Sequence, residues 1–184
     1  MKLPLALVAA TALVAGCTPG PENATEAAND SAVTNIVTPK PKPSKSADQA
    51  YVDGVAALNT YMAAAAGLAE QKGGSAKVKA FGKKMVLDRN QSIMKLKIAA
   101  AKIPGILIDP SLDDEQNDNL KTLQNASGAA FDTAYKAQTI VALTKLLSML
   151  EARYSAGGGD PDIKYFASYA APPVRANLAA ARAL

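Results

Sequence analysis

The stretch AKVKAFGKKMVLDRNQSIMKLKIAAAKI, residues 76–103, has the repeat of one long amphipathic helix. At about 100° per residue, its large apolar side chains fall on one stripe. That stripe consists of Val78, Phe81, Met85, Leu96 and Ile103. Arg89 falls in the middle of the stripe and Asp88 near its edge. The sequence therefore predicts a buried helical seam that contains a charged pair, and the function of the chain depends on what that pair does.

Composition limits the classes of function. The 184 residues suffice for one folded domain, and the net charge of +4 is modest for a nucleic-acid-binding protein. The chain has no His, which removes the commonest general base and metal ligand. Its glycine run at residues 157–159 lacks the preceding strand and following Lys of a phosphate-binding loop. We therefore predict that the protein is not an enzyme, has no catalytic residue, and binds no metal, cofactor or nucleic acid.

Residues 1–17, MKLPLALVAATALVAGC, have the form of a lipoprotein signal peptide. Lys2 precedes an apolar run that is too short to span a bilayer as a helix. The run ends in Val-Ala-Gly-Cys, which resembles a bacterial lipobox, and Cys17 is the only Cys of the chain. We expect cleavage before Cys17 and lipid attachment to its thiol; the alternative is a plain secretory signal with an incidental Cys. Thr18, in place of an Asp that retains lipoproteins in the inner membrane, favours the periplasmic face of the outer membrane.

A linker is expected at residues 18–46. This segment is rich in Pro, Ala, Thr, Asn and Ser, has no apolar period, and carries alternating prolines from Pro39 to Pro43. Such a composition is typical of a disordered tether with an extended polyproline II part. The folded domain is then predicted to span residues 47–184.

Four long amphipathic segments and one short one fill the predicted domain. The long segments are residues 48–72, 76–103, 128–156 and 162–184. A short helix is expected with Ser111 as its N-cap. Pro172 and Pro173 are expected to kink or break the last segment. The sequence therefore predicts an all-α fold, an antiparallel four-helix bundle with an additional short helix and a Pro-broken last helix.

The inward stripes of these segments form the expected core. They are Tyr51, Val55, Leu58, Met62 and Ala69 in the first segment, and Phe131, Tyr135, Leu143, Leu146, Leu150 and Tyr154 in the fourth. Ser75, and Asp160 followed by Pro161, are the expected N-caps of two long helices. A minor apolar stripe, Leu87, Met94 and Ile98, lies opposite the main stripe of residues 76–103. We expect the loop at residues 106–108 to cover it; a dimer contact is the alternative.

Three strings in the predicted domain look familiar together. They are AKVKAFGKKMVLDR at residues 76–89, FDTAYKAQTIVAL at residues 131–143 and PPVRANLAAARAL at residues 172–184. Their order and spacing resemble the ferritin-like family called domain of unknown function 4142. The resemblance covers residues 47–184 and implies a ferritin-like bundle in an exported bacterial protein.

The resemblance also marks a degenerate family site. Members of the family typically carry His where Arg89, Leu143 and Asn177 stand, and Glu is common at the position of Met62. A Glu and three His in a bundle core imply a metal or acid–base site. With Asp88, the positions of the site here are Met62, Asp88, Arg89, Leu143 and Asn177. Arg cannot ligate a metal and Leu has no donor atom, so the family's constellation is erased in this chain.

Other roles for these residues stay open. Asp88 and Arg89 are either an anion site inside the bundle or a structural pair, with Arg89 snorkelling or facing an acidic group. Asn177 is expected as a satisfied polar core residue, bonded to Arg89 or to a water. Met62 is expected as core filling, with a soft-metal site of Met62 and Met85 as the alternative.

Four lysines share one side of the helix at residues 76–103: Lys77, Lys84, Lys95 and Lys102. They are suited to contact anionic lipid or another polyanion; the alternatives are the acidic segment at residues 109–118 and plain solvent. The leading hypothesis is a non-enzymatic, lipid-anchored bundle protein that binds an envelope partner or maintains the envelope. A divergent metal or redox site of carboxylates and Met, and an anionic-surface binder, are the other two. The sequence leaves the oligomeric state open.

Overall fold

The computed structural model describes residues 45–184, and within them the chain is all-helical, with five helices and no strand. The helices are α1 (Ala47–Lys72), α2 (Ala76–Ala100), α3 (Asp114–Asn125), α4 (Gly128–Ser155) and α5 (Pro161–Arg182). Cys17, the signal peptide and all but the end of the expected linker lie outside the described residues. The all-α prediction is therefore confirmed for residues 45–184.

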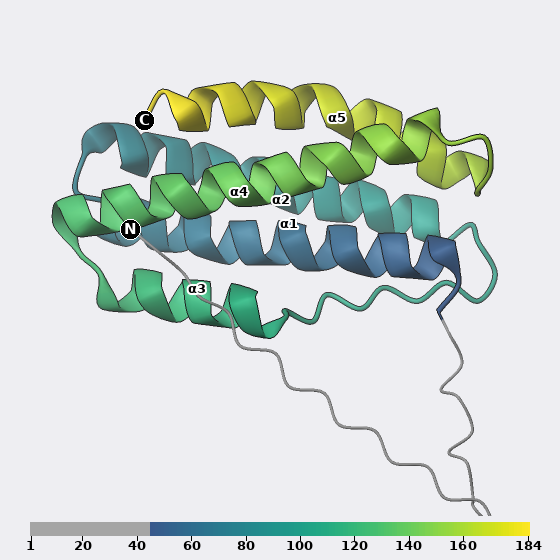
Figure 1. Cartoon of the computed structure of the whole chain (residues 1–184), viewed down its shortest axis with the longest axis horizontal. Helices are drawn as coiled ribbons and strands as arrows, with labels where there is room; N and C mark the ends of the chain where they lie inside the picture. Colours follow the sequence, from purple (N-terminus) through teal and green to yellow (C-terminus); the bar gives the residue numbers. More distant parts are fainter. Residues whose placement is uncertain (1–44) are drawn as a thin grey trace, which may run out of the picture. The chain divides into compact units, whose positions relative to one another are not determined.

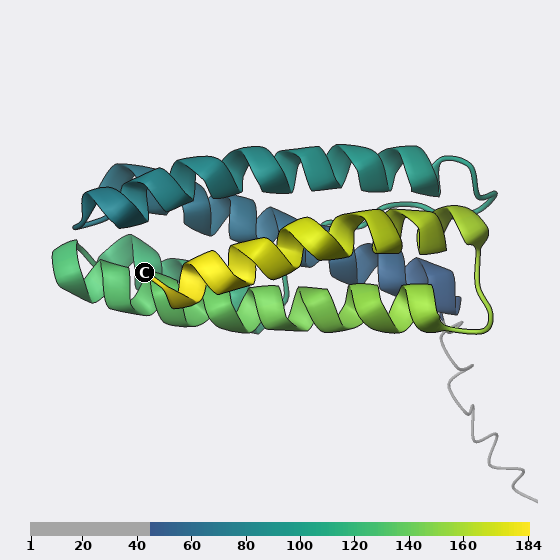
Figure 2. The same ribbon diagram turned by 90° about the horizontal axis from the view of Figure 1, so that it is seen from above.

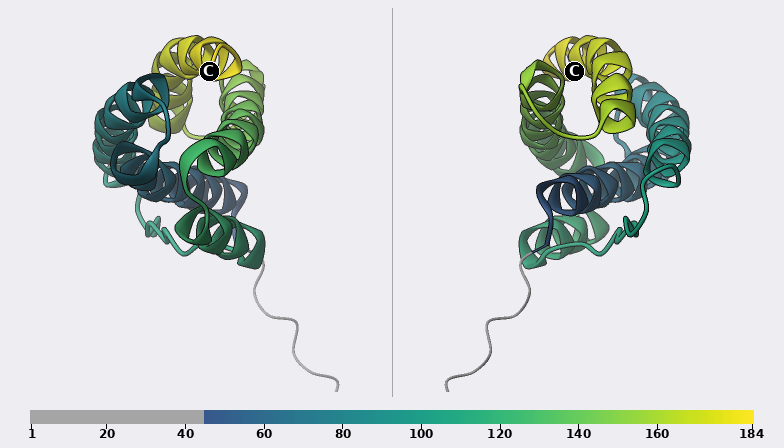
Figure 3. Two further views of the ribbon diagram at one scale, coloured as in Figure 1. Left: turned by 90° about the vertical axis from the view of Figure 1, so that its left-hand side faces the viewer. Right: turned by 90° about the vertical axis from the view of Figure 1, so that its right-hand side faces the viewer.

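The long helices pack as two hairpin-like pairs. α1 packs most extensively on α2, and α4 on α5 (Figure 1). The pairs meet through α1 with α4 and through α2 with α5, as the view from above shows (Figure 2). Residues 101–127 carry the chain back along the molecule, so that α2 and α4 run in the same direction, and α3 lies outside α1 and α4 (Figures 1 and 3). The inward stripes of the four long helices consequently share one core.

The predicted stripes account for most of this core. Val78, Phe81, Met85 and Leu96 of α2 are buried, and Arg89 among them is buried as well. The stripe of α4 is buried from Phe131 to Leu150, but Tyr154 is 43% exposed, which corrects its expected core position. Tyr154 stands in the last turn of α4, where it lines the open groove between α4 and α5.

Helix caps decide where the elements begin. Ser75 accepts a hydrogen bond from the Val78 N–H, and Asp160 with Pro161 starts α5, as predicted. The expected cap Ser111 is wrong, because the N-cap of α3 is Asp113, two residues later. Asp113 and Gln116 form a capping box, in which each side chain accepts from the other residue's backbone N–H at 2.8 and 3.1 Å. This reciprocal pair satisfies two helix-end donors, whereas a lone Ser satisfies one.

The minor apolar stripe of α2 is not covered by the 106–108 loop, which corrects that expectation. Leu87, Met94 and Ile98 are 62–66% exposed. The loop follows α1 instead: the Leu107 N–H donates to Gln49 at 3.0 Å, and the Asp109 N–H donates to Asp53 at 3.0 Å. These hydrogen bonds hold the loop against the first turns of α1. A dimer contact through the stripe stays a prediction.

The expected break at Pro172 and Pro173 is absent, because α5 runs through both prolines as one helix (Figure 2). A proline inside a helix leaves the carbonyl four residues earlier without its N–H donor. Here those carbonyls belong to Ser168 and Tyr169, which are on the exposed side, as are both prolines. Water can satisfy the two carbonyls. The buried residues of α5 before and after the two prolines keep the helix packed on the core.

The double variant Pro172→Ala/Pro173→Ala is expected to stabilise the protein by about 4 kcal/mol, about 2 kcal/mol at each position. Each interior proline costs about 3 kcal/mol relative to Ala in a helix, and the extra freedom of the unfolded chain offsets about 1 kcal/mol of the gain. Urea unfolding followed by circular dichroism measures the change. A loss of stability would show that the two rings make packing contacts that outweigh two helical hydrogen bonds.

Candidate functional site

The positions of the degenerate family site come from the four long helices. Met62 lies on α1, Asp88 and Arg89 on α2, Leu143 on α4 and Asn177 on α5. Four of these residues are fully buried, and the Asp88 side chain is 25% exposed. Met62 and Leu143 belong to the apolar core. The polar members divide into two arrangements, one around Asp88 and one around Arg89.

Lys84, Asp88 and Asn177 form a closed triangle between α2 and α5. The Asn177 amide donates to Asp88 Oδ2 at 2.7 Å, and the Lys84 amine donates to Asn177 Oδ1 at 2.7 Å. The same amine pairs with Asp88 Oδ2. Asn177 is thus a satisfied polar residue, as expected, but its partners are Asp88 and Lys84 rather than Arg89. The triangle fixes α5 to α2 at the level of the site.

The triangle also sets the charge state of Asp88. Burial raises the pKa of Asp88, but hydrogen bonds from Lys84 and Asn177, with the positive charges of Lys84 and Arg89, outweigh it. The net pKa of Asp88 therefore lies below its ordinary value. A carboxylate with a lowered pKa stabilises the fold above the unfolded-state pKa, and this contribution is lost as the pH falls through the folded-state pKa.

Asp88→Asn is therefore expected to flatten the acid limb of the stability curve. Wild-type stability falls as the pH drops below about 4, the ordinary pKa of Asp, and the variant loses less over the same interval because it has no proton to take up there. Urea midpoints between neutral and acid pH measure the slope. The matched control, Asp118→Asn, removes an exposed ion pair with Lys121 and should keep the wild-type slope, since exposed pairs contribute little. Equal slopes in the wild type and Asp88→Asn would contradict the expectation.

Arg89 is buried without a matching negative charge. The residue is 1% exposed, and its Nη1 donates to Asn59 Oδ1 at 3.3 Å. Within residues 45–184, its Nε has no hydrogen-bond partner, and no carboxylate lies within ion-pair distance. Burial lowers the pKa of Arg89, and the nearby Asp88 opposes the shift. A guanidinium stays protonated in proteins, so the core carries a positive charge here.

Asn59 is a site residue that sequence reasoning missed. It is fully buried on α1, one turn from Met62, and its amide donates to the Val55 carbonyl at 2.8 Å. This bond turns Oδ1 toward Arg89. A signal was present, because residues 55, 59 and 62 share the inward stripe of α1 and Asn59 is its polar member.

A small pocket adjoins Arg89 between α2 and α5. Its volume is about 50 Å³. Asp88, Arg89 and Lys95 are among the residues that line it from α2, and Phe166 and Tyr169 are among those that line it from α5. Lys95 places its amine 3.4 Å from the centre of the Tyr169 ring, a cation–π contact. The pocket therefore combines two cationic side chains and one carboxylate with aromatic and aliphatic walls.

All four lysines of the expected anionic-surface face contact α5 or the residues next to it. Lys77 donates to the Ala183 carbonyl, Lys84 joins the triangle, Lys95 lies over Tyr169, and Lys102 pairs with Asp162 at 2.6 Å. The structure thus places them along the α2–α5 seam rather than against the acidic segment at residues 109–118. Contact with an anionic surface stays a prediction, and such a surface would compete with these partners.

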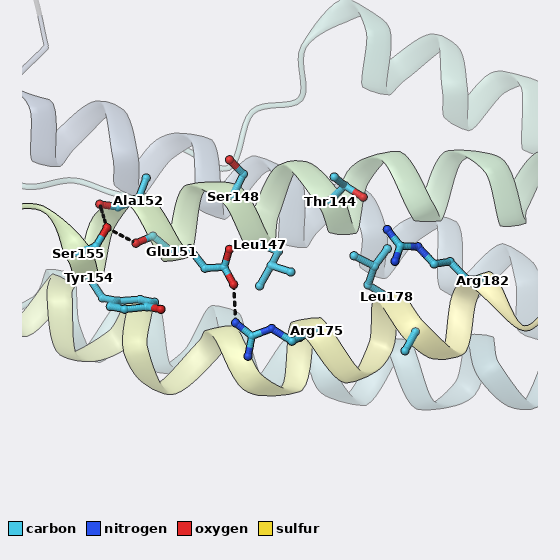
Figure 4. A pocket seen from close by; sticks show the side chains of 11 residues that line it. Thr144, Leu147, Ser148, Glu151, Ala152, Tyr154, Ser155, Arg175, Leu178 and Arg182 are labelled. Carbon is cyan, nitrogen blue, oxygen red and sulfur yellow. Dashed lines mark hydrogen bonds and ion pairs between the residues drawn. The ribbon is translucent and has the colours of Figure 1, made fainter.

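A second hollow, about 830 Å³ in volume, follows the α4–α5 groove (Figure 4). Glu151 and Arg175 point toward each other across it and form an ion pair. Leu147 and Leu178 provide apolar walls, and Arg182 lines the same groove. Sequence reasoning missed this groove because it depends on which faces of α4 and α5 meet, and its residues belong to no motif.

Asp132, in the string FDTAY, joins α4 to the start of α2. Its carboxylate accepts the backbone N–H groups of Gly74 and Ser75 at 2.7 and 2.9 Å. Phe131 and Tyr135 of the same string stack with their ring centres 5.9 Å apart. The string is therefore an architectural element, and no atom of Asp132 is placed among the residues of the degenerate site.

No group of three or more His, Cys, Asp or Glu side chains in residues 45–184 is arranged to hold a metal ion. In the same range, none of the helices has the length and apolar character needed to cross a bilayer.

Comparison of the chain with known proteins identifies a family. Neither the curated proteins nor the solved structures provide a match. The profile of the family described as "Domain of unknown function (DUF4142)" matches residues 34–184, beginning within the expected linker. This match covers most of the chain and includes all five helices and every position of the degenerate site. The chain therefore belongs to the DUF4142 family.

Proposed function

We propose that this protein is a non-catalytic, lipid-anchored protein of the bacterial envelope that acts by binding, with a ferritin-like bundle in which the family's metal or acid–base site is lost. The observation that carries the proposal is the buried guanidinium of Arg89 at a position of that site. The anchor rests on the lipobox and Cys17 in the sequence.

The arrangement of the helices supports the ferritin-like type. Bundles of this type have one long crossover, so that the second and third long helices run in the same direction. Here α2 and α4 share their direction, and the segment with α3 forms the long connection between them (Figure 1). α1 with α2, and α4 with α5, are joined by short turns at residues 73–75 and 156–160.

The chemistry of the site supports the loss of metal binding. A permanent cation in a medium of low dielectric repels a divalent metal ion far more strongly than it does in water. Leu143 offers no donor atom, and Asn177 and Asp88 are already engaged with each other and with Lys84. The site residues that remain polar thus serve to hold helices together.

Metal analysis of the full-length protein tests the proposal. The wild type, purified without chelator and exposed to iron, copper, zinc and manganese, is expected to retain none. The restored variant Met62→Glu/Arg89→His/Leu143→His/Asn177→His is expected to retain a stoichiometric metal ion, because it has the ligand types that such a site requires. Stoichiometric metal in the wild type would overturn the proposal and favour the divergent metal or redox alternative. A restored variant without metal would show that these positions do not form one site.

Cys17→Ser tests the anchor. The wild type is expected in the membrane fraction and the variant in the soluble periplasmic fraction, because stable anchoring requires the acyl chains that the thiol carries. Density-gradient separation of inner and outer membranes then distinguishes the two membranes. Retention in the membrane fraction of a variant from which residues 1–16 have been removed would contradict lipid anchoring through Cys17.

A further inference from the structure

A patch of exposed apolar side chains lies on α2 and continues onto α5. Leu87, Met94 and Ile98 of α2 are 62–66% exposed, and Tyr165 and Tyr169 of α5 are 73% and 50% exposed. Ile98 and both tyrosines line one hollow of about 200 Å³, so the stripe of α2 adjoins the tyrosines of α5. We call these five side chains the α2–α5 apolar face. Contiguous apolar patches with a polar border are typical of interaction sites.

Lysines border the α2–α5 apolar face on both sides. At about 100° per residue, Lys83 and Lys97 fall on one flank of the α2 stripe and Lys95 on the other. Within residues 45–184, none of these three lysines has a carboxylate within ion-pair distance. Lys84 and Lys102 nearby are already paired with carboxylates. The border of the face therefore carries three positive charges that the described residues do not compensate.

These side chains favour a lipid surface over a second copy of the chain. Tyr is enriched where membranes meet water, and a helix with lysines beside an apolar stripe is typical of proteins that lie in that interface. Interfaces between proteins are instead depleted of Lys. A symmetric dimer through this face would bring the bordering lysines of both copies together with their charges uncompensated. Anionic lipid headgroups complement those charges.

The place where the folded domain begins agrees with a lipid surface as partner. α1 starts at the end of the bundle where α2 ends and α5 starts (Figure 1). Ile98 and Tyr165 lie in the parts of α2 and α5 nearest to this end. An extended linker of the length predicted for residues 18–46 reaches roughly 90 Å, whereas α2 is only about 40 Å long. A lipid anchor before this linker therefore allows α2 to lie along the membrane.

We infer that the α2–α5 apolar face lies on an anionic phospholipid bilayer, with α2 parallel to the membrane plane. Leu87, Met94 and Ile98 enter the boundary between headgroups and acyl chains. The two tyrosines lie at the level of the headgroups, and the bordering lysines contact lipid phosphates. The inference rests on the proposed function, because the anchor at Cys17 keeps the face near a bilayer, and it makes that bilayer a binding partner of the folded domain.

Vesicle sedimentation tests the inference without the anchor. The chain that starts at residue 17 and carries Cys17→Ser has neither signal peptide nor lipid. We expect it to bind vesicles of phosphatidylglycerol and phosphatidylcholine in equal parts, and to bind pure phosphatidylcholine at least about tenfold more weakly, because the lysines then lack an anionic partner. An absence of binding to the anionic vesicles would overturn the inference.

That failure is distinguishable from a failure of the anchor. Contact through the face alone is reversible, so an alkaline carbonate wash of cell membranes releases a chain that has no lipid. A chain with acyl chains on Cys17 stays in the membrane through the same wash. A wild type that resists the wash, together with an unlipidated chain that binds no vesicles, would overturn the inference and leave the proposed anchor supported.

The triple variant Leu87→Ser/Met94→Ser/Ile98→Ser, made in the unlipidated chain, tests the apolar contribution. It is expected to fold, because all three side chains are exposed, and to bind the anionic vesicles at least about tenfold more weakly at low and at high salt. The control Val141→Ser changes a side chain of α4 that is as exposed as Met94 and should bind like the parent chain. Parent-like binding by the triple variant would overturn the inference.

Lys83→Gln/Lys97→Gln tests the charge contribution. We expect this variant to bind the anionic vesicles about tenfold more weakly at low salt, with the difference shrinking as salt screens the lysines. The control Lys136→Gln/Lys145→Gln removes the same charge from α4 and should keep most of the binding. Equal losses in both variants would overturn the inference, because only the net charge would then matter.

A single Trp reports on the face directly, because the chain has none of its own. The fluorescence of Tyr165→Trp is expected to shift to shorter wavelength with anionic vesicles and to be quenched by brominated acyl chains, whereas that of Val141→Trp should not change. Unchanged fluorescence of Tyr165→Trp would overturn the inference. Sedimentation equilibrium examines the second copy: a dimer in solution that the triple serine variant abolishes would assign the face to another chain and overturn the inference as well.

Discussion

Gly82→Leu is expected to destabilise the protein by at least about 4 kcal/mol. A loss of this size is exceptional for a point mutation and is typical of severe core disruption. Gly82 is buried on α2 where α2 crosses α1. A Cβ at this position would lie 2.8 Å from the Ala66 carbonyl oxygen and 3.0 Å from the Glu70 N. Both atoms belong to the backbone of α1, so they cannot rotate away as a side chain would. A leucine would force the two most extensively packed helices apart.

The size of this effect follows from what has to move. Overpacking by a few methylene groups costs about 1–3 kcal/mol when side chains can adjust. At Gly82 the adjustment must come from α1 itself, and the contacts along the whole α1–α2 pair weaken together. Since a domain of this size has a stability of about 5–15 kcal/mol, we expect a largely unfolded variant or a molten one.

Gly67→Ala is the matched control for Gly82→Leu. Gly67 is a helical glycine of α1, and a Cβ added to it would meet nothing within 4 Å. Alanine there is expected to stabilise the protein by about 0.5–1 kcal/mol, because it has the higher helix propensity and lowers the entropy of the unfolded chain. Urea unfolding of both variants measures the opposite signs. Wild-type stability of Gly82→Leu would mean that α1 and α2 do not approach closely at this point.

Local signals of the sequence predicted the helices well because helix periods and caps depend on neighbouring residues. The buried stripe of Val78, Phe81 and Met85 and the cap at Ser75 are confirmed. The predicted break at Pro172 is wrong because the carbonyls that lose their N–H donors face water. Which carbonyls face water depends on how α5 packs on the core, and the local sequence does not determine this.

The contact partners of a side chain on other helices were less predictable from the sequence than whether the side chain is buried. Arg89 is buried where the stripe placed it, but its partner Asn59 lies 30 residues earlier on another helix. The lysines of α2 share one side as predicted, yet whether that side meets lipid, acid or α5 depends on helix packing that no local pattern encodes. The exposure of the stripe Leu87, Met94 and Ile98 was not predicted for the same reason. The loop that was expected to cover it is hydrogen-bonded to α1 instead.

Asp132→Ala is expected to lower the stability by about 2–3 kcal/mol. The carboxylate accepts two hydrogen bonds, from Gly74 N and Ser75 N, at the N-terminal end of α2. Hydrogen bonds to a charged acceptor are worth about 1.5–3 kcal/mol, and the negative charge interacts favourably with the helix dipole. Water reaches the exposed Gly74 and Ser75 in the variant and recovers part of the loss.

The position of Asp132 adds to its effect. Gly74 lies directly against Gly128 at the start of α4, where a Cβ on Gly74 would be 2.6 Å from the Gly128 carbonyl carbon. The carboxylate of Asp132 therefore stabilises the contact between the start of α4 and the turn that joins α1 and α2, and it bonds to Gly74, which lies more than fifty positions away in the sequence. Asp132→Asn keeps one acceptor oxygen and is expected to lose about half as much stability as Asp132→Ala.

Thermal and urea unfolding of Asp132→Ala, Asp132→Asn and the neighbouring control Thr133→Ala measure these differences. The Thr133 hydroxyl bonds only within α4, to the Ala129 carbonyl, so its removal should change the stability by less than about 0.5 kcal/mol. Equal stabilities of Asp132→Ala and Thr133→Ala would contradict the capping role. Because Asp132 acts on helix packing and its hydrogen bonds involve Gly74 and Ser75 and not Arg89, Asp132→Ala should lower the stability by loosening the junction of α2 and α4.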